Sequence, residues 1–195
     1  MAADGPRVWI VRHGETEWSR SGQHTGRTDL PLTPEGERQA EALGRVLAGR
    51  RFALVLTSPR RRARDTCRIA GFAAEAQEDP DLAEWDYGEY EGMTRREIEQ
   101  RDPGWTIWTH RVPGGETGDQ VAARADRIVA KAAAAGDALL FSHGHLLRVL
   151  AARWLGLPLE EGRRFALDPA TLGILGAERE ARVVRIWNAP AGWSS

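Results

Sequence analysis

Four side chains that together could bind a phosphoryl group and attack its phosphorus each follow a short apolar run: Arg12, His13, Arg62 and His143. The planar guanidinium group of arginine matches phosphate oxygens through two parallel hydrogen bonds. A neutral imidazole is a competent nucleophile toward phosphorus, and a phosphohistidine intermediate would divide hydrolysis into two displacements. These residues therefore predict a phosphate pocket with a histidine at its floor. Chemistry alone leaves open whether His13 or His143 is the nucleophile.

An alcohol that leaves phosphorus needs a proton, and the acidic stretch 82–92 holds the candidate donors. A carboxylic acid beside a phosphate dianion keeps its proton more readily, because like charge disfavours ionisation. Glu84, Asp86, Glu89 and Glu91 all lie in this stretch. Physical reasoning from the residues leaves the choice among these four carboxyl groups open.

Buried strands would bring these side chains together. Apolar, β-rich runs predict strands at 7–11, 53–57 and 138–141, and two closing strands or a hairpin at 171–177 and 182–187. Helical patterns alternate with the strands, which predicts an α/β fold: a three-layer α/β/α sandwich with a mostly parallel central sheet. Right-handed crossovers place the carboxyl ends of parallel strands at one edge, where ligands bind. The turns after the first three strands are therefore expected to form one pocket.

The helices are predicted from capping residues and from apolar side chains at helical spacing. They are expected at 33–49, from Ser58-Pro59 through Thr66, at 94–101, at 121–136 and at 146–154. Thr33 and Ser58 are the expected N-caps, each followed by a proline at the first helical position. The segment 75–118 is rich in Gly, Trp and polar residues and is predicted to be a small cap insertion of loops plus one short helix. One domain, 1–195, is expected.

Length and charge exclude several classes of protein. The chain has 195 residues with 27 basic and 28 acidic side chains, so no long-range field would draw it onto nucleic acid. No run approaches the ~20 apolar residues of a membrane span, and the start lacks a signal-peptide pattern, so neither membrane insertion nor secretion is expected. With a single cysteine, Cys67, no internal disulfide can form, and the cytoplasm is the expected location. Oligomeric state is left open, with a homodimer as the candidate assembly.

The motif RHGETEW at 12–18 resembles the opening motif of the histidine phosphatase superfamily, the phosphoglycerate mutase-like proteins. Further stretches resemble family motifs in the family's order. These are TGRTDL at 25–30, SPRRRA at 58–63, LAE at 82–84, GGET at 114–117 and SHG at 142–144. One short motif has little weight, whereas several in register across almost the whole chain indicate membership.

The resemblance implies a role for each matching residue. His13 would be the phosphorylated nucleophile, while Arg12, Arg62 and His143 would hold the phosphoryl oxygens. Glu84 matches the family's proton donor. The resemblance also implies that no metal ion or other cofactor is needed, because the arginines neutralise the charge that magnesium neutralises in other phosphoryl-transfer sites.

The stretch 19–26 holds the expected contacts to a small phosphorylated substrate. Ser19 stands where many relatives carry an asparagine that binds phosphate, and a hydroxyl could donate a hydrogen bond there. Gln23, Thr25 and Gly26 are expected to bind the substrate.

Stretches 15–19, 23–26, 82–92 and 105–108 look most like bacterial broad-specificity acid phosphatases and sedoheptulose-1,7-bisphosphatases. This favours a phosphomonoester hydrolase acting on small metabolites such as sugar phosphates or bisphosphates. One alternative is a cofactor-dependent phosphoglycerate mutase, although those relatives carry a longer cap insertion. Another is a non-catalytic protein that only binds phosphorylated ligands, which would be expected to lack the nucleophile, an arginine or the proton donor.

Several other residues have a structural interpretation beside a functional one. Trp85, Trp105 and Trp108 could form the core of the cap or a platform for the substrate, and the sequence does not decide between them. Cys67 is expected to be a small buried apolar side chain. His145 is expected to pack in the interior or to lie beside the substrate.

Overall fold

A six-stranded sheet forms the centre of the fold. The structure, a computed structural model, describes residues 5–192. The strands lie in the order β3-β2-β4-β1-β5-β6. Their bounds are β1 Val8–Arg12, β2 Leu54–Thr57, β3 Ala76–Glu78, β4 Ala138–Ser142, β5 Thr171–Glu178 and β6 Ala181–Pro190. The first four strands run parallel, and β5 and β6 form an antiparallel hairpin that closes the sheet, so the predicted α/β fold is confirmed.

The register of β1 on β4 brings the two histidines of the predicted pocket together. The last residues of these strands, Arg12 and Ser142, pair with each other, so His13 and His143 follow at the same level. β2 ends at the neighbouring level on the other side of β4, which brings Ser58 to the same edge. Three segments that are far apart in the sequence therefore meet at one edge of the sheet, as the strand pattern predicts.

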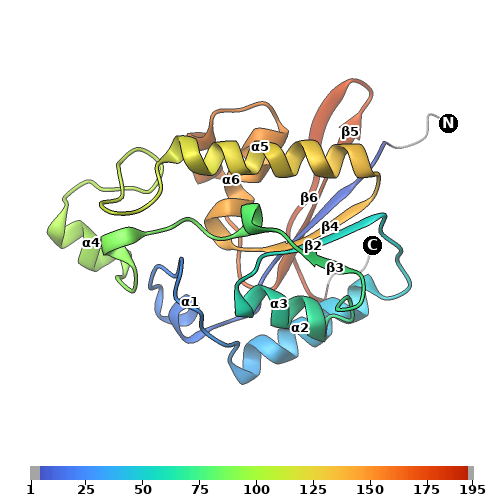
Figure 1. The fold of residues 1–195 in the computed structure, drawn as a ribbon, viewed down its shortest axis with the longest axis horizontal. Helices are drawn as coiled ribbons and strands as arrows, with labels where there is room; N and C mark the ends of the chain where they lie inside the picture. Colours follow the sequence, from blue (N-terminus) through green and yellow to red (C-terminus); the bar gives the residue numbers. More distant parts are fainter. Residues whose placement is uncertain (1–4, 193–195) are drawn as a thin grey trace.

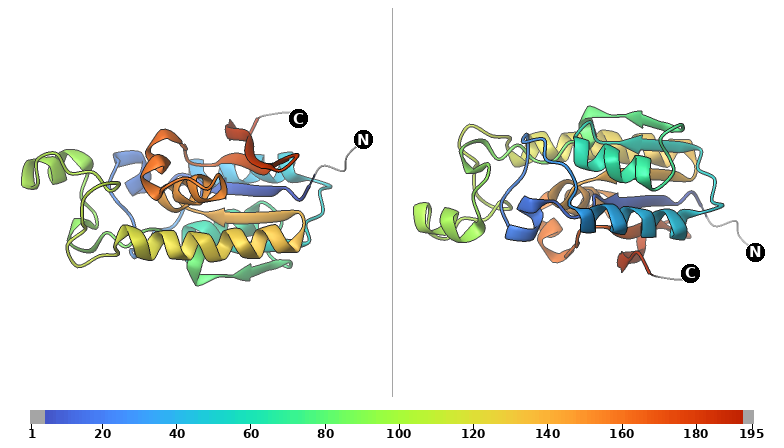
Figure 2. Two further views of the ribbon diagram at one scale, coloured as in Figure 1. Left: turned by 90° about the horizontal axis from the view of Figure 1, so that it is seen from above. Right: turned by 90° about the horizontal axis from the view of Figure 1, so that it is seen from below.

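Two pairs of helices cover the two faces of the sheet. In Figure 1, α5 (Gly118–Ala135) and α6 (Gly144–Trp154) lie on one side of the strands, and α2 (Pro34–Leu47) and α3 (Arg61–Ile69) lie on the other. Alternate residues of β1 belong to two separate apolar clusters, one packed against each helix pair. Figure 2 shows the same layers from above and below. Within residues 5–192, no helix is long and apolar enough to cross a membrane.

Capping residues set the starts of α2 and α5. The Thr33 side chain accepts a hydrogen bond from the N–H of Gly36, and Pro34 occupies the first helical position of α2. Thr117 and Gln120 form a reciprocal capping box at the start of α5. Both caps fix the directions of the segments that enter these helices.

The predicted cap at Ser58 is wrong. α3 begins at Arg61, and its N-cap, Arg60, makes no side-chain capping bond. The Ser58 hydroxyl lies 2.7 Å from Nε2 of His143, which explains why this serine belongs to the pocket edge rather than to the helix.

The segment 75–118 leaves the sheet after the short edge strand β3. It contains the 3₁₀ turns η1 (Pro80–Leu82) and η2 (Gly88–Tyr90) and the helix α4 (Arg95–Arg101). Figure 1 shows α4 beyond the edge toward which β1 runs. The sequence pattern missed β3 because its three residues have mixed polarity, and it also missed α1 (Glu17–Ser21) and η3 (Leu159–Arg164). The description of this segment as a cap stays a prediction.

Candidate active site

A cavity of about 170 Å³ opens at the carboxyl-terminal edge of the sheet. The residues singled out from the sequence that line it are Arg12, His13, Ser19, Gln23, Thr25 and Glu84. Its wall also includes His24, Tyr87, Gly144, His145, Arg148 and Leu167. Gly26, Arg62 and His143 are buried behind this wall.

His13 is held as a neutral imidazole with a defined tautomer. Its Nδ1 lies 2.7 Å from the carbonyl oxygen of Gly14, and because a carbonyl only accepts, Nδ1 carries the proton. Burial, followed by the cations of Arg62 and Arg12, lowers the pKa of His13 well below 6.5. Nε2 therefore holds a lone pair at neutral and at mildly acidic pH.

Arg12 brings a desolvated cation with an unpaired donor to the cavity. Its Nη1 donates a hydrogen bond to the carbonyl of Leu167. Its Nε is buried and has no hydrogen-bond partner within residues 5–192. Burial lowers the pKa of Arg12, and the negative charge of Glu84 opposes that shift. A buried N–H without an acceptor costs free energy, so an anionic ligand would gain from binding here.

Arg62 and His143 lie next to His13 and are fully buried. The ring centroids of the two histidines are 5.2 Å apart. Arg62 donates from Nε to Nδ1 of His143 at 3.2 Å, and from Nη1 and Nη2 to carbonyl oxygens of the loop 25–28 at 2.8 to 3.3 Å. Burial and the Arg62 cation lower the pKa of His143 well below 6.5. The guanidinium is thus engaged by protein acceptors, and the expected contacts of Arg62 and His143 with phosphate stay predictions.

Glu91 holds the loop 25–28 from the opposite side. Its carboxylate accepts hydrogen bonds from the N–H of Gly26 at 3.0 Å and of Thr28 at 2.9 Å. Gly26 has no space for a side chain, because a Cβ would lie 2.5 Å from the carbonyl oxygen of Trp85. Gly26 therefore joins the loop to the acidic stretch, and its expected contact with the substrate stays a prediction.

Glu84 sits at the amino end of α6. One carboxylate oxygen accepts hydrogen bonds from the N–H groups of Trp85 and Leu146, both at 2.9 Å, and the other accepts from the N–H of His145 at 3.0 Å. The partial positive charge of a helix amino terminus favours such a carboxylate. Among the four carboxyl groups that the sequence left open, Glu84 is the one in the cavity wall.

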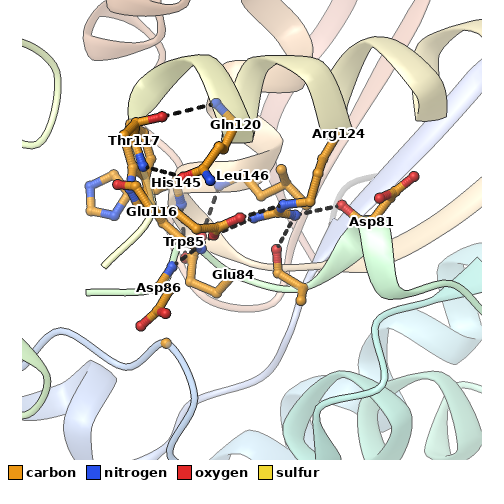
Figure 3. A network of polar contacts seen from close by, with 12 residues as sticks. Asp81, Glu84, Trp85, Asp86, Glu116, Thr117, Gln120, Arg124, His145 and Leu146 are labelled. Atoms are coloured by element: carbon orange, nitrogen blue, oxygen red, sulfur yellow. Dashed lines mark hydrogen bonds and ion pairs between the residues drawn. The ribbon is translucent and has the colours of Figure 1, made fainter. Parts of the chain in front are cut away.

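A partly buried clamp positions the segment that carries Glu84 (Figure 3). Arg124 of α5 makes two parallel hydrogen bonds to Glu116, at 2.9 and 2.8 Å, and its Nη1 donates to the carbonyls of Asp81 and Ala83. Glu116 also accepts a hydrogen bond from the N–H of Asp86, and its carbonyl accepts one from the Trp85 indole. The GGET motif thus contributes a carboxylate that fixes the acidic stretch on both sides of Glu84.

Ser19, Gln23 and Thr25 line the cavity but already make internal hydrogen bonds. The Ser19 hydroxyl donates to the carbonyl of Thr16 at 3.0 Å and accepts from its N–H at 2.9 Å, within the capping box of α1. Gln23 donates from Nε2 to the carbonyl of Gly92, and the Thr25 hydroxyl donates to the carbonyl of Gln23. Hydrogen bonds from the two hydroxyls to a substrate would replace the internal ones, and the three binding roles stay predictions.

Among the wall residues that the sequence reasoning missed, three have polar side chains: His24, Tyr87 and Arg148. The Tyr87 hydroxyl lies 2.5 Å from Nδ1 of His145, and burial raises the pKa of Tyr87 well above 10. The imidazoles of His24 and His145 stack with their centroids 5.9 Å apart. A signal for Arg148 was present, because it is a charged residue between apolar ones early in the helix that follows the SHG motif.

The structure also places the cysteine and the three tryptophans of the sequence analysis. Cys67 is buried, and burial raises its pKa to about 12, as for a small apolar core residue. Trp85 and Trp105 are buried in the apolar cluster that includes α5 and α6, and Trp108 is half-buried against it. Within residues 5–192, no group of three or more His, Cys, Asp or Glu side chains could hold a metal ion.

The family model of the histidine phosphatase superfamily (branch 1) matches residues 8–190. The chain belongs to this superfamily. An acid phosphatase from Mycobacterium tuberculosis is 44% identical over 191 residues, which cover 95% of this chain and 94% of that relative. Sedoheptulose 1,7-bisphosphatase from Saccharomyces cerevisiae is 39% identical, over 80% of this chain and 70% of its own.

Solved structures of other histidine phosphatases share the fold. The product of a Mycobacterium tuberculosis open reading frame has a TM-score of 0.90 at 42% identity, over 95% of this chain and 98% of that chain. Mycobacterial glucosyl-3-phosphoglycerate phosphatase has a TM-score of 0.83 at 29% identity, over 94% of this chain and 99% of that chain. The resemblance inferred from the motifs is therefore confirmed.

Proposed function

We propose that this histidine phosphatase hydrolyses phosphomonoesters of small phosphorylated metabolites through a phosphohistidine at His13. The observation that carries the proposal is the fixed tautomer of His13. Its Nδ1 keeps the proton and donates it in a hydrogen bond to the carbonyl of Gly14, so Nε2 keeps its lone pair. Arg12 lines the same cavity, and its buried Nε, without a partner within residues 5–192, would gain from an acceptor such as a phosphoryl oxygen. Two of the relatives, an acid phosphatase and a sedoheptulose 1,7-bisphosphatase, support this class of reaction.

In the first step, Nε2 of His13 forms a bond to phosphorus while the bond from phosphorus to the ester oxygen breaks. Glu84 gives its proton to the departing alcohol oxygen. In the second step, water attacks phosphorus, the phosphorus–nitrogen bond breaks, and Glu84 takes the proton from the water. Arg12, Arg62 and His143 are proposed to stabilise the charge on the phosphoryl oxygens in both steps.

The buried position of His13 suits this sequence of steps. Because its pKa lies well below 6.5, the nucleophile stays neutral in mild acid as well as at neutral pH. A small phosphorylated metabolite is the proposed partner, and a cytoplasmic location and a homodimer stay predictions.

Trapping of the intermediate tests the proposal. Rapid quenching after mixing with a ³²P-labelled phosphomonoester should give a phosphoenzyme that survives base and is lost in acid, with the label on His13. His13→Ala should abolish the label, whereas His110→Ala, at an exposed position, should retain it. Label that persists in His13→Ala would refute the assignment of the nucleophile.

The fate of the phosphoryl group separates a hydrolase from a mutase. A hydrolase should release inorganic phosphate from sugar phosphates without 2,3-bisphosphoglycerate. Interconversion of 2- and 3-phosphoglycerate should be much slower than phosphate release, even with that primer present. Efficient primer-dependent interconversion with negligible release of phosphate would overturn the hydrolase proposal.

A further inference from the structure

A second chamber of about 520 Å³ adjoins the catalytic cavity. The two share the side chains of His24, His145 and Arg148 in their walls. The chamber therefore lies next to the catalytic cavity, and a ligand with its phosphoryl group at His13 would have to pass these three residues to reach it. None of the roles assigned above to the catalytic residues accounts for this space.

The charges that line the chamber are all positive. Arg95, Arg148 and Arg163 belong to its wall, and no Asp or Glu does. Arg163 is paired with Glu161 at 3.2 Å. Arg95 and Arg148 have no ion pair with any carboxylate within residues 5–192. Two cations without counter-charges at one cavity favour an anion as its occupant.

Arg148 is held in place before any ligand binds. Its Nε and Nη2 donate hydrogen bonds to the carbonyl oxygens of Gly162 and Arg163, both at 3.1 Å. Its guanidinium lies over the Trp108 ring, 4.6 Å from the centroid. Trp108 in turn packs so closely on Gly162 that a Cβ there would lie 2.7 Å from the indole. Within residues 5–192 these contacts leave Nη1 without a protein acceptor. They also leave the side chain little conformational freedom to lose when a ligand binds.

Burial lowers the pKa of Arg148, with Glu84 opposing the shift, so this cation is partly desolvated. Hydrogen bonds from a desolvated guanidinium to an anion are stronger than those made in water. The neighbouring imidazoles do not supply the charge, because burial lowers the pKa of both His24 and His145 below 6.5. At neutral pH the positive charge of the chamber therefore comes from its arginines.

Two tryptophans, Trp105 and Trp108, also line the chamber. Trp105 and Trp108 each contact an imidazole edge to face, Trp105 with His24 at 5.6 Å and Trp108 with His145 at 5.3 Å. Such a wall suits the carbon skeleton of a small metabolite, while the arginines suit a charged end group. The catalytic cavity and the chamber together fit a molecule that carries anionic groups at two separated positions.

We infer that the chamber is a second anion subsite, built by Arg148 and Arg95, that holds a phosphate or carboxylate group of the substrate away from the scissile phosphate. The inference rests on the proposed phosphatase function and names its substrate class: small bisphosphates or phosphorylated acids. A monophosphate without a second anion leaves both arginines unpaired and should be a poorer substrate.

Matched substrate pairs test the inference. Fructose 1,6-bisphosphate is compared with fructose 1-phosphate and fructose 6-phosphate, and 3-phosphoglycerate with glycerol 3-phosphate. For at least one pair, kcat/KM should be higher for the substrate with two anionic groups by roughly tenfold or more, since a charge-assisted hydrogen bond contributes about that factor. The first pair identifies a subsite for phosphate, and the second identifies one for carboxylate. Values near one for both pairs would overturn the inference.

Two variants test the residues. Arg95→Gln and Arg148→Gln should each lower that preference by roughly tenfold. Arg96→Gln removes the same charge from the next position of α4, outside the chamber wall, and should leave the preference unchanged. Arg95 is exposed and makes none of the hydrogen bonds found for Arg148, so its variant remains informative even if Arg148→Gln fails to fold. A preference that persists in Arg95→Gln, and in Arg148→Gln where it folds, would refute the subsite.

The outcome also separates this inference from the proposed function. Hydrolysis of p-nitrophenyl phosphate without any preference for a second anion would overturn only the subsite. Absence of phosphate release from every substrate, p-nitrophenyl phosphate included, would overturn the phosphatase function and the subsite with it. Added salt should reduce the preference for substrates with two anionic groups, because ions screen the arginines.

Discussion

Arg62 and His143 form a buried pair in which the guanidinium Nε donates to the imidazole Nδ1 at 3.2 Å. Because guanidinium nitrogens only donate, Nδ1 must be unprotonated, and the neutral ring carries its proton on Nε2. That proton can be donated to the Ser58 hydroxyl, 2.7 Å away. The same arginine holds the loop 25–28 through its Nη atoms. Arg62 therefore sets both the tautomer of a pocket histidine and the position of a loop beside the cavity.

Replacement of Arg62 by lysine should damage both catalysis and stability. Lysine keeps the charge but cannot donate in three directions from a planar group, so the loop and His143 lose their common partner. We expect a loss of about 2 to 4 kcal/mol in the free energy of unfolding, as for a broken buried network. We also expect kcat/KM to fall by roughly a hundredfold. Urea denaturation and steady-state kinetics measure the two effects.

Arg61→Lys provides the control for this variant. Arg61 is the preceding residue, its side chain is exposed, and its ion pair with Asp65 lies at the surface. It should change neither quantity appreciably. Equal effects of Arg61→Lys and Arg62→Lys would contradict the role given to the buried guanidinium.

The pair formed by Arg124 and Glu116 should matter more than a neighbouring ion pair on the same helix. The Arg124 side chain is 12% exposed and also binds two carbonyls next to Glu84, whereas the Arg127 side chain is 58% exposed and binds only Asp81. Arg124→Met should cost about 3 kcal/mol of stability, because it leaves a partly buried carboxylate without its cation and two carbonyls without this donor. Arg127→Met should cost much less. Equal losses of stability in thermal or urea unfolding would be inconsistent with the clamp.

The sequence predicted more of the fold than of the contacts within the site. Apolar runs that end in turns sufficed to predict that His13 and His143 lie at one edge, because the carboxyl ends of parallel strands share an edge of the sheet. The clamp of Glu116 on Arg124 could not be derived in the same way, since it depends on how a loop folds back onto α5. Ser58 was interpreted as a helix cap because the sequence does not show that its hydroxyl contacts His143.

Replacement of Glu84 by glutamine should reveal its proton transfer through the leaving group. Glutamine cannot give a proton to a departing alkoxide, so kcat for a sugar phosphate should fall by roughly a hundredfold or more. p-Nitrophenolate leaves without protonation, so its release in the first turnover, before Glu84 takes a proton from water, should change little. Glu89→Gln, at an exposed carboxylate paired with Arg101, is the matched control and should affect neither substrate. If the first-turnover release of both leaving groups slows equally in Glu84→Gln, another group supplies the proton.

The buried histidines should make the protein less stable in mild acid. His13 and His143 have pKa values well below 6.5 in the fold, whereas in the unfolded chain each returns to about 6.5. Below that pH the unfolded state binds more protons, so the free energy of unfolding falls as the pH falls, by up to about 1.4 kcal/mol per pH unit for each histidine. Urea denaturation at a series of pH values from about 7.5 to about 5 measures this slope, above the range where most carboxylates titrate. His143→Asn keeps an acceptor for Arg62 but cannot titrate, so its slope should be shallower by one histidine's share. A stability that stays constant over this range, or a slope that His143→Asn leaves unchanged, would show that these imidazoles are not held neutral by the fold.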